Sequence, residues 1–513
     1  MKKMLLTFIV ICMLIFISGC DENDDDVTPL FDMMIGENGN WFFNGEDTNI
    51  KAIGEDGRKT TFRINNGVVE WKYVGDSQWI PLINIEEEIE PEYTDGIVLN
   101  EVTGLGYTVV GYEGNEDEVI IPATYKGIEI YKIADGAFLN SNVKKVRIGI
   151  NVKVIGNSAF EEAKELEEVI FDEGSKLEEI GDAAFYNCDN LESINIPATL
   201  KKIGYCAFFL LDNLICEYDD IYGVKYIGSK ENPYLILYDT AGSSIKECVV
   251  DDRCKFIADY AFTYCSSLET LIIPEGVVSI GSSAIYSCGS LKEIYIPSTV
   301  NYIGDATFNC SSNIEKMVVS ENNKTYDSRN NCNAIIETKT NTLIYGCKNT
   351  LIPESIETIR DKAFYAISTL ESIYIPKNVS HIGEYVFSMC TSLSNIEVDI
   401  ENKTFTSRDS SGNNCNVIIK IGSYTQTLLY GGANEDGTLI VPSGVTTIGI
   451  EAFRGRLKLN EITIPKSVYS INDYAFDYCK NLKVINNASN LVFELKSNSY
   501  GGIAYYATTI NKI

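Results

Sequence analysis

One phrase, Ile-Gly-x-x-Ala-Phe, returns along most of this 513-residue chain and limits what the chain can fold into. It occurs, for example, at Ile155–Phe160, Ile180–Phe185 and Ile203–Phe208. The aromatic or aliphatic residue that ends it recurs, mostly in steps of 22–25 residues, at Phe138, Phe160, Phe185, Phe208, Phe262, Ile285, Phe308, Phe364, Phe387, Phe453 and Phe476. A repeat of this length predicts a solenoid, in which each unit buries its apolar face against its neighbours.

Each unit begins as a short strand. Leu291, Ile294 and Ile296 occupy alternating places that point inward, while the residues between them face solvent. Pro297 ends this strand, because proline has no N–H for a ladder and suits a corner. A second extended piece follows, and a compact turn or helical loop then buries Phe308. We therefore expect a mainly β or α/β solenoid with a short strand per coil and a spine of stacked Phe residues.

Three of the steps are longer and hold insertions, near residues 215–245, 320–347 and 399–435. The second and third share a frame that ends in Leu-Ile-Tyr-Gly or Leu-Leu-Tyr-Gly, and the first is a looser copy. Two β-rich runs that flank turn residues predict a β-hairpin in each. Such insertions either shape a binding surface on one edge of the solenoid or only widen the coil.

The full pattern is Leu-x-x-Ile-x-Ile-Pro-x-x-Val-x-x-Ile-Gly-x-x-Ala-Phe-x-x-Cys, and it covers about residues 100–490. It resembles the BspA-type, or Treponema pallidum-type, leucine-rich repeat, with Phe and Gly in place of the asparagine ladder of commoner repeats. The resemblance implies a leucine-rich repeat solenoid. It also implies an exported surface protein of a host-associated bacterium that acts in adhesion, including binding to extracellular-matrix proteins and coaggregation.

The N-terminus reads as an export signal. Residues 1–19 combine Lys2 and Lys3 with an apolar stretch that is short for a membrane span, and they end before Cys20. Ile17-Ser18-Gly19-Cys20 resembles the lipobox of bacterial lipoproteins, which implies lipidation of Cys20. The acidic residues of the tether 20–30 resemble the surface-export signal of Bacteroidota lipoproteins. We therefore expect an outer-membrane protein that faces the exterior and contacts the membrane through its lipid anchor only.

Two short segments separate this tether from the repeats. Residues 31–85 hold all three tryptophans, Trp41, Trp71 and Trp79, and their alternating β-branched and aromatic residues predict a small β module. The tryptophans either form its core or offer a platform for sugars. Residues 86–99 read as an acidic linker. At the other end of the chain, residues 491–513 are expected to cap the solenoid.

Charge and composition disfavour several functions. A formal net charge of −30 repels phosphate backbones, so nucleic acid is not an expected partner. The chain has a single histidine, His381, which is expected to be a solvent-facing strand residue. We therefore expect no enzyme, no catalytic residue, no metal site and no cofactor.

Cys310 lies two residues after the spine position, and five cysteines of the repeats lie three after it: Cys188, Cys265, Cys288, Cys390 and Cys479. A ladder of buried thiols is expected there instead of disulfides. Only Cys332 and Cys347, which flank one insertion, are placed to close a loop as a disulfide.

The outward positions of the first strand in each coil make the candidate ligand surface, because extended faces are what solenoids use for binding. We name these candidates the strand ribbon: Lys144, Lys145, Arg147, Glu293, Tyr295, Glu371 and Tyr374. The favoured function is adhesion or protein–protein interaction, with a host or bacterial surface protein as partner. The alternative is an accessory glycan-binding surface lipoprotein that uses the tryptophans or the solenoid tyrosines.

Overall fold

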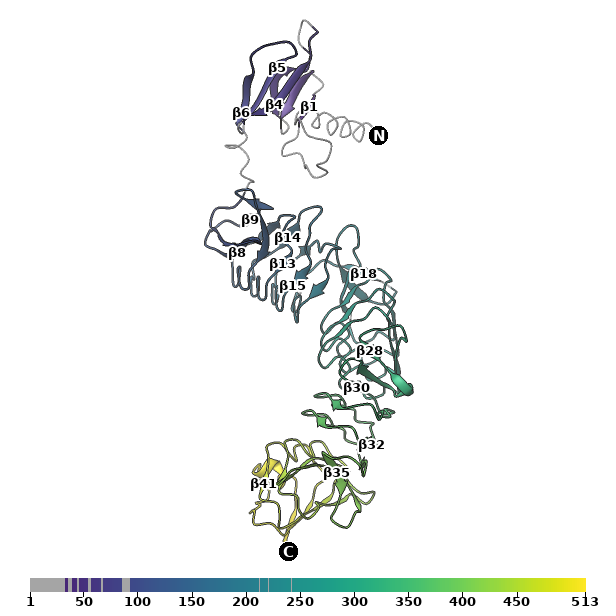
Figure 1. The fold of residues 1–513 in the computed structure, drawn as a ribbon. Helices are drawn as coiled ribbons and strands as arrows, with labels where there is room; N and C mark the ends of the chain where they lie inside the picture. The colour runs from purple at the N-terminus through teal and green to yellow at the C-terminus, as the bar shows by residue number, and fades with distance from the viewer. Residues whose placement is uncertain are drawn as a thin grey trace. The chain divides into compact units, whose positions relative to one another are not determined.

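The computed structural model describes residues 33–35, 39–43, 46–53, 57–65, 68–84, 93–211, 213–219, 221–240 and 242–513. The chain forms two compact units: residues up to Tyr93 together with Thr124–Ile128, and Thr94–Ala123 together with Glu129–Ile513. Within the described ranges the regular structure is almost entirely β (Figure 1), the exceptions being the 3-10 helices η1 (Arg329–Asn331) and η2 (Tyr500–Gly502). Signal 1–19, Cys20, tether 20–30 and linker residues 86–92 lie outside the described residues.

The first unit contains two small antiparallel sheets. They consist of β1 (Met33–Ile35), β2 (Asn40–Phe43) and β3 (Glu46–Lys51), and of β4 (Thr60–Asn65), β5 (Val68–Tyr73) and β6 (Ile80–Asn84). The unit also takes in β10 (Thr124–Tyr125). Trp41 meets the buried Phe62 edge to face, with ring centroids 5.2 Å apart. The predicted small β module is confirmed.

The second unit is a solenoid whose coils each add strands to two parallel ladders. Alternate residues of the strands are buried, as in β12, because one face lies on the core. The first-strand ladder contains β9 (Glu118–Ile121), β12 (Lys145–Ile148), β14 (Glu168–Phe171), β16 (Ser193–Ile194), β21 (Glu247–Val249), β23 (Thr270–Ile272), β25 (Glu293–Ile296), β27 (Lys316–Val319), β32 (Ser372–Ile375), β34 (Asn395–Val398), β38 (Thr438–Ile440), β40 (Glu461–Ile464), β42 (Val484–Asn487) and β43 (Thr509–Lys512). These strands belong to several short sheets, so the first-strand ladder is not continuous along the solenoid.

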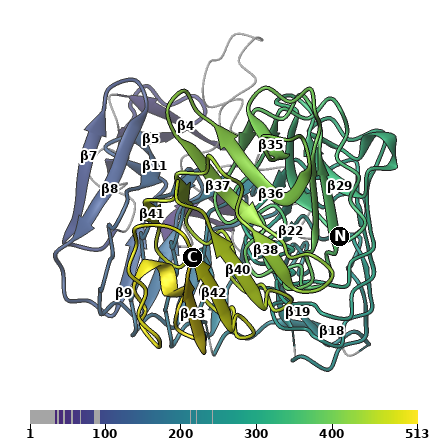
Figure 2. The same cartoon turned by 90° about the horizontal axis from the view of Figure 1, so that it is seen from below.

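The second-strand ladder runs through the Ile-Gly positions. It contains β8 (Gly106–Tyr112), β11 (Ile128–Ile133), β13 (Val154–Ile155), β15 (Glu179–Ile180), β17 (Lys202–Ile203), β22 (Phe256–Ile257), β24 (Ser279–Ile280), β26 (Tyr302–Ile303), β31 (Thr358–Ile359), β33 (His381–Ile382), β39 (Thr447–Ile448) and β41 (Ser470–Ile471). β7 (Ile97–Val102) opens the solenoid by pairing antiparallel with β8, so the strand begins within the predicted linker 86–99. At the other end β43, in the predicted cap, pairs parallel with β42, and Figure 2 shows β40, β42 and β43 side by side.

The predicted Phe spine is present. Phe138, Phe160, Phe185 and Phe208 stack with successive centroid distances of 4.9, 5.1 and 5.7 Å. Each Phe lies in a turn and not in a helix, and the turns themselves bond from coil to coil. The N–H groups of Ser158, Phe160 and Glu162, for example, donate to carbonyls of the next coil at 2.7–2.9 Å. The burial of these rings stabilises each coil, together with the buried Ile, Leu and Val residues around them.

The insertions are three-stranded antiparallel meanders, which contain the predicted hairpin and one further strand. They consist of β18 (Glu217–Asp219), β19 (Val224–Ile227) and β20 (Ile236–Thr240); of β28 (Tyr326–Asp327), β29 (Ala334–Glu337) and β30 (Thr342–Gly346); and of β35 (Phe405–Arg408), β36 (Asn414–Ile421) and β37 (Gln426–Gly431). The last strand of each joins the second-strand ladder, where β20 pairs with β22, β30 with β31 and β37 with β39.

Two strands of each later insertion are buried on both faces and divide the core. Ile335 packs into the cluster that contains Phe308, whereas its neighbour Ile336 packs into the cluster that contains Phe364. In the third insertion Ile418 belongs to the cluster of Phe364, and Ile419 to that of Phe453. We call β29, β30, β36 and β37 the wall strands. Burial on both faces explains their unbroken apolar runs.

The thiol ladder exists, and it is more than apolar filling. Four thiols donate to the carbonyl of the spine residue in the previous coil, at 2.9–3.1 Å: Cys188 to Phe160, Cys288 to Phe262, Cys390 to Phe364 and Cys479 to Phe453. Ser311 takes the same place in its coil, and its Oγ donates to the carbonyl of Ile285 at 2.8 Å. Burial raises the pKa of the Cys288 thiol to about 12, so this thiol is unreactive at neutral pH.

The sequence pattern predicts Phe and Gly in place of an asparagine ladder, but the structure also has a second ladder, which is made of polar side chains. Asp135 Oδ1 accepts the N–H of Asn157 at 3.1 Å, and Asn157 Oδ1 accepts the N–H of Asp182 at 2.8 Å. The glycine of the Ile-Gly pair makes room for it, since a Cβ on Gly181 would lie 2.5 Å from Asn157 Oδ1. The repeat therefore combines a Phe spine with a carboxylate and amide ladder.

Candidate functional site: the strand ribbon and a cleft at the first insertion

The structure places the strand ribbon on three separate sheets of the first-strand ladder. Lys145 and Arg147 lie on β12, with Lys144 just before it, whereas Glu293 and Tyr295 lie on β25. Tyr374 lies on β32, and Glu371 directly precedes that strand. Lys144 is half-buried and the other six side chains are exposed, so their outward orientation is as predicted. The three groups belong to different coils and do not form one compact site.

The basic start of the ribbon is ion-paired along the solenoid. Lys144 Nζ lies 2.8 Å from Asp117 Oδ2, Lys145 Nζ lies 3.2 Å from Glu168 Oε2, and Arg147 Nε lies 2.7 Å from Asp172 Oδ1. The hydrogen bond to Asp117 and its charge raise the pKa of Lys144. Because each cation has an acid beside it, this end of the ribbon presents mixed charge and not a basic patch.

The two ribbon tyrosines differ in their surroundings. Tyr295 is 48% exposed and Tyr374 is 43% exposed. The Tyr374 hydroxyl donates to Asp399 Oδ2, and this hydrogen bond raises the pKa of Tyr374 to about 12. In the same coil as Tyr295, Glu293 lies 3.4 Å from Lys316 Nζ. Tyr374 is therefore held in one orientation by its neighbour.

Two sequence expectations about single residues are resolved. Cys332 and Cys347, whose pairing the sequence leaves open, are both buried free thiols. Cys347 Sγ donates to the carbonyl of Asn333 at 3.3 Å, and Cys332 Sγ points to the carbonyl of Ala334. Each of the two thiols therefore faces a different backbone carbonyl. His381 lies exposed on β33, at the outward place that was predicted.

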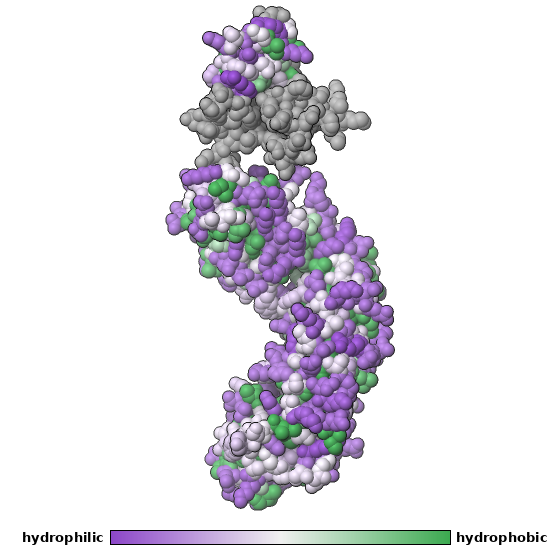
Figure 3. Space-filling view, viewed as in Figure 1, coloured by the Kyte–Doolittle hydropathy of each residue, from purple (hydrophilic) through white to green (hydrophobic). Residues whose placement is uncertain are grey.

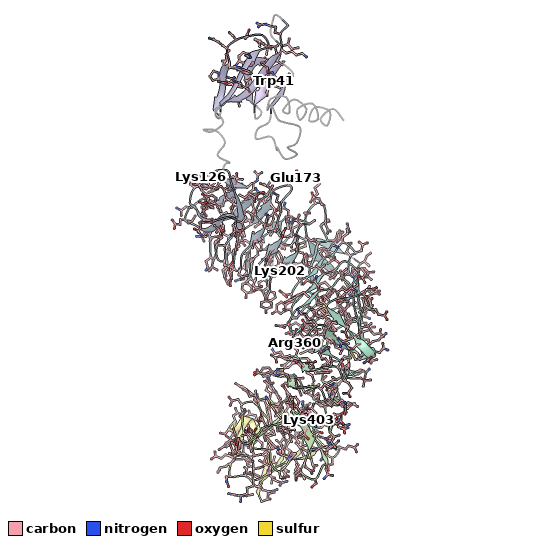
Figure 4. All side chains as sticks on the ribbon, viewed as in Figure 1. Trp41, Lys126, Glu173, Lys202, Arg360 and Lys403 are labelled. Carbon is pink, nitrogen blue, oxygen red and sulfur yellow. The ribbon has the colours of Figure 1, made fainter. Side chains whose placement is uncertain are left out.

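The tryptophans of the first unit have limited free ring surface. Trp41, labelled in Figure 4, packs against Phe62. The ring of Trp79 lies under two cations, with Arg63 Cζ at 4.4 Å and Lys72 Nζ at 4.7 Å from its centroid. Contacts of this kind occupy the ring face that a sugar would need. The sugar-platform reading of these residues is not favoured.

The solenoid carries a cleft of about 670 Å³ beside the first insertion, which the sequence analysis did not single out. The cleft occurs where one residue pair of the first insertion differs from the equivalent pair of the later insertions. In the later insertions the wall ends in Tyr345-Gly346 and Tyr430-Gly431, and a Cβ on either glycine would lie within 2.2 Å of the next spine ring. By strand register the first insertion has Asp239-Thr240 at this place, because Leu237 pairs with Ile257 as Leu343 pairs with Ile359. Asp239 thus lies where the later insertions place the closing tyrosine, Thr240 lies in place of the glycine, and Asp239 lines the cleft.

The first insertion therefore lacks the closing tyrosine of the later ones. Tyr345 and Tyr430 are buried, and their hydroxyls bond backbone groups of the preceding coil, at Thr307 N and Val386 N respectively. Tyr238 is half-buried, and its hydroxyl donates to the carbonyl of Leu211 at 3.1 Å. Tyr238 lies at the place of Ile344 and Leu429, and its ring lines the cleft.

Aromatic rings form the sides of the cleft. Phe209 and Tyr260 have centroids 4.6 Å apart, and Tyr264 meets Tyr286 edge to face at 5.9 Å. The hydroxyl of the lining residue Tyr260 lies 2.7 Å from the hydroxyl of Tyr205. Tyr264 is 64% exposed. These residues flank the spine position on successive coils, a signal that an alignment of the repeats could have revealed.

Three charged side chains reach the cleft. Lys225 Nζ and Asp239 Oδ2 form an ion pair at 2.9 Å. Asp259 accepts the N–H groups of Cys206 and Ser282 with its two oxygens, and burial raises its pKa. The walls thus combine apolar rings with polar groups that already have partners. That combination is typical of small-molecule sites, which are mostly apolar with a few fixed polar groups.

Two further features concern anchoring and metals. The described part of the chain contains no helix with the length and hydropathy needed to cross a membrane. Among the same residues, no three His, Cys, Asp or Glu side chains are grouped so that they could hold a metal ion.

Comparison with known proteins bears on the repeats. The model of the BspA type Leucine rich repeat region matches residues 123–229, 240–345, 336–422 and 435–510, in six copies. No curated protein matches the chain. Three solved structures are similar over most of their length. A leucine rich cell surface protein from Faecalibacterium prausnitzii is 23% identical, with 81% of this chain and 97% of that chain covered and a TM-score of 0.43.

The pneumococcal vaccine antigen PcpA is 19% identical, with coverage of 79% and 89% and a TM-score of 0.39. A leucine-rich repeat protein from Bacteroides ovatus is 21% identical, with coverage of 82% and 100% and a TM-score of 0.33. The matched repeats extend over more than half of the chain, and they carry the Phe spine and parallel ladders described above. The protein therefore belongs to the BspA-type leucine-rich repeat family.

Proposed function

We propose that this protein is a lipid-anchored surface lipoprotein whose solenoid serves adhesion or protein–protein interaction. The observation that carries the binding role is the strand ribbon, where tyrosines and acids stand exposed on strands held rigid by parallel ladders. Rigid aromatic residues lose little conformational entropy on binding and are common in interaction hot spots. The face seen in Figure 3 is mostly hydrophilic, with scattered apolar residues, as expected of a surface that meets partners transiently.

The anchoring part of the proposal rests on the sequence. The stretch before Cys20 supports lipidation of that thiol, and the acids of the tether 20–30 support export to the outer face of the outer membrane. Other members of the BspA-type leucine-rich repeat family are implicated in adhesion to host or bacterial surface proteins. No catalytic role is proposed.

Anchoring is tested by treating intact cells with a non-permeant protease and blotting for the solenoid. We expect degradation in wild type, and protection when Asp21–Asp26 are neutralised; a Cys20→Ala variant should leave the membrane fraction. Protection of wild type on intact cells, with degradation after lysis, would contradict surface display.

Binding is tested by applying the purified full chain to immobilised extracellular-matrix proteins. The double variant Tyr295→Ala with Tyr374→Ala should bind about tenfold more weakly. Tyr424→Ala is the matched control, because Tyr424 is 98% exposed and lies outside the ribbon. Equal binding by both variants would exclude the ribbon as the binding surface.

A further inference from the structure

The cleft at the first insertion has the size and lining of a ligand site. Its volume of about 670 Å³ falls within the roughly 300–1,000 Å³ of pockets that hold small ligands. The spine is closed at the later insertions by Tyr345 and Tyr430, each of which packs edge to face on a spine Phe. The fold therefore has a sealed form of this junction, and the first insertion departs from it.

The charges of the cleft exclude strongly ionic ligands. Lys225 and Asp239 neutralise each other at 2.9 Å, so neither offers a bare charge to a ligand. Asp259 is held by two backbone N–H groups and adds negative charge, which disfavours phosphates and carboxylates. The lining is instead rich in rings and in groups able to donate and accept hydrogen bonds.

The aromatic lining favours a flat, amphipathic ligand. Tyr264 is largely exposed and meets Tyr286 edge to face, while Phe209 and Tyr260 form a second pair of rings in the lining. The C–H face of a sugar ring packs on such aromatic surfaces, and its hydroxyls need polar partners at the ring's edge. The Lys225–Asp239 pair supplies a donor and an acceptor side by side.

We propose that this cleft binds a neutral carbohydrate, with a sugar ring stacked on Tyr264 and its hydroxyls bonded to the Lys225–Asp239 pair. The site is distinct from the strand ribbon and does not rest on the adhesion proposal. It places sugar recognition on the solenoid, between the first insertion and the coil of Phe262, and not on the tryptophans of the first unit.

The test uses the full chain and isothermal titration with defined neutral oligosaccharides: cellotriose, maltotriose, mannotriose, xylotriose and N-acetyllactosamine. Sialyllactose serves as an anionic probe. We expect one or more neutral sugars to bind, and Tyr264→Ala to weaken that binding about tenfold or more, given the loss of one stacking ring. Asp239→Asn should weaken it less, because the amide keeps an acceptor. Tyr424→Ala should leave it unchanged.

Three results would overturn the proposal. The first is a lack of binding by every neutral sugar in the panel, and the second is sugar binding that survives Tyr264→Ala. The third is saturable binding of a Phe- or Tyr-containing peptide that Tyr264→Ala abolishes while no sugar competes, which would assign the cleft to a protein partner. Tyr264 is exposed, so its variant is expected to fold; unchanged thermal unfolding confirms this.

Discussion

At the scale of single residues, one side chain departs sharply from the repeat. Arg456 stands three residues after the spine Phe453, at the place of the thiol ladder, and is only 1% exposed. Its Nε donates to the carbonyl of Gly431 at 2.7 Å, and its terminal nitrogens donate to the carbonyls of Phe387 and Cys390 at 3.0–3.1 Å. Burial lowers the pKa of this guanidinium, but an arginine keeps its charge. The longer side chain links the coils on both sides of the third insertion.

We therefore expect Arg456→Met to lower the free energy of unfolding by about 3 kcal/mol, since it leaves buried carbonyls with fewer donors. Chemical denaturation followed by circular dichroism measures the change. Arg253→Met is the control: its ion pair with Asp251 is partly exposed, and such pairs contribute about 0–1 kcal/mol. If both variants lose the same stability, the carbonyl contacts of Arg456 contribute little.

At the scale of elements, the insertions serve first as parts of the core. The wall strands supply apolar residues to the clusters on both of their sides, and the Tyr-Gly pair ends each wall against a spine ring. The choice left open in the sequence thus has an answer for the second and third insertions, which partition the core. The first insertion contributes Val224, Tyr226 and Leu237 to the cluster of Phe262, and it also borders the cleft.

Gly431, the last residue of the wall strand β37, allows a direct test of how tightly the wall packs on the spine ring. A Cβ on Gly431 would lie 2.0 Å from Phe453 Cε1, in a core with little room to relax. We expect Gly431→Ala to destabilise the protein by about 1–3 kcal/mol through overpacking. Gly289→Ala is the matched control, because no atom lies within 4 Å of its added Cβ. Thermal unfolding separates the two; a Gly431→Ala variant as stable as the control would show that the junction can open.

The features of the fold that recur in every repeat could be predicted from the sequence. Inward apolar residues, the Phe spine, the hairpins and the buried thiols all repeat along the chain, so their places follow from sequence. The hydrogen bonds and ion pairs between coils could not be predicted, because they depend on which residues the strand register brings together. Asp135 and Asn157 are 22 positions apart, and Arg147 and Asp172 are 25 apart. The cleft borders Asp239, whose difference from Tyr345 and Tyr430 becomes informative only when the strand registers of the three insertions are compared.

At the scale of the whole molecule, the described solenoid has a divided core. Separate clusters contain Phe262 and Phe308, Phe364 and Phe387, and Phe453 and Phe476, with the wall strands between them. In repeat proteins the stability is close to a sum over units and their nearest-neighbour interfaces. A wall that is itself bonded on both sides can stay folded when one neighbouring cluster opens. We therefore expect the solenoid to unfold cluster by cluster.

Native-state hydrogen exchange with mass spectrometry tests this expectation. Phe453→Ala removes a fully buried ring and should cost about 3–5 kcal/mol locally. Amides of β39, β40 and β41 should then exchange faster, while those of β22, β24 and β25 keep the protection seen in wild type. Phe262→Ala should give the reverse pattern, because that ring lies in the cluster bounded by the first and second insertions. If either variant instead lost protection evenly along the solenoid, the wall strands would be transmitting the change, and the core would behave as one cooperative unit.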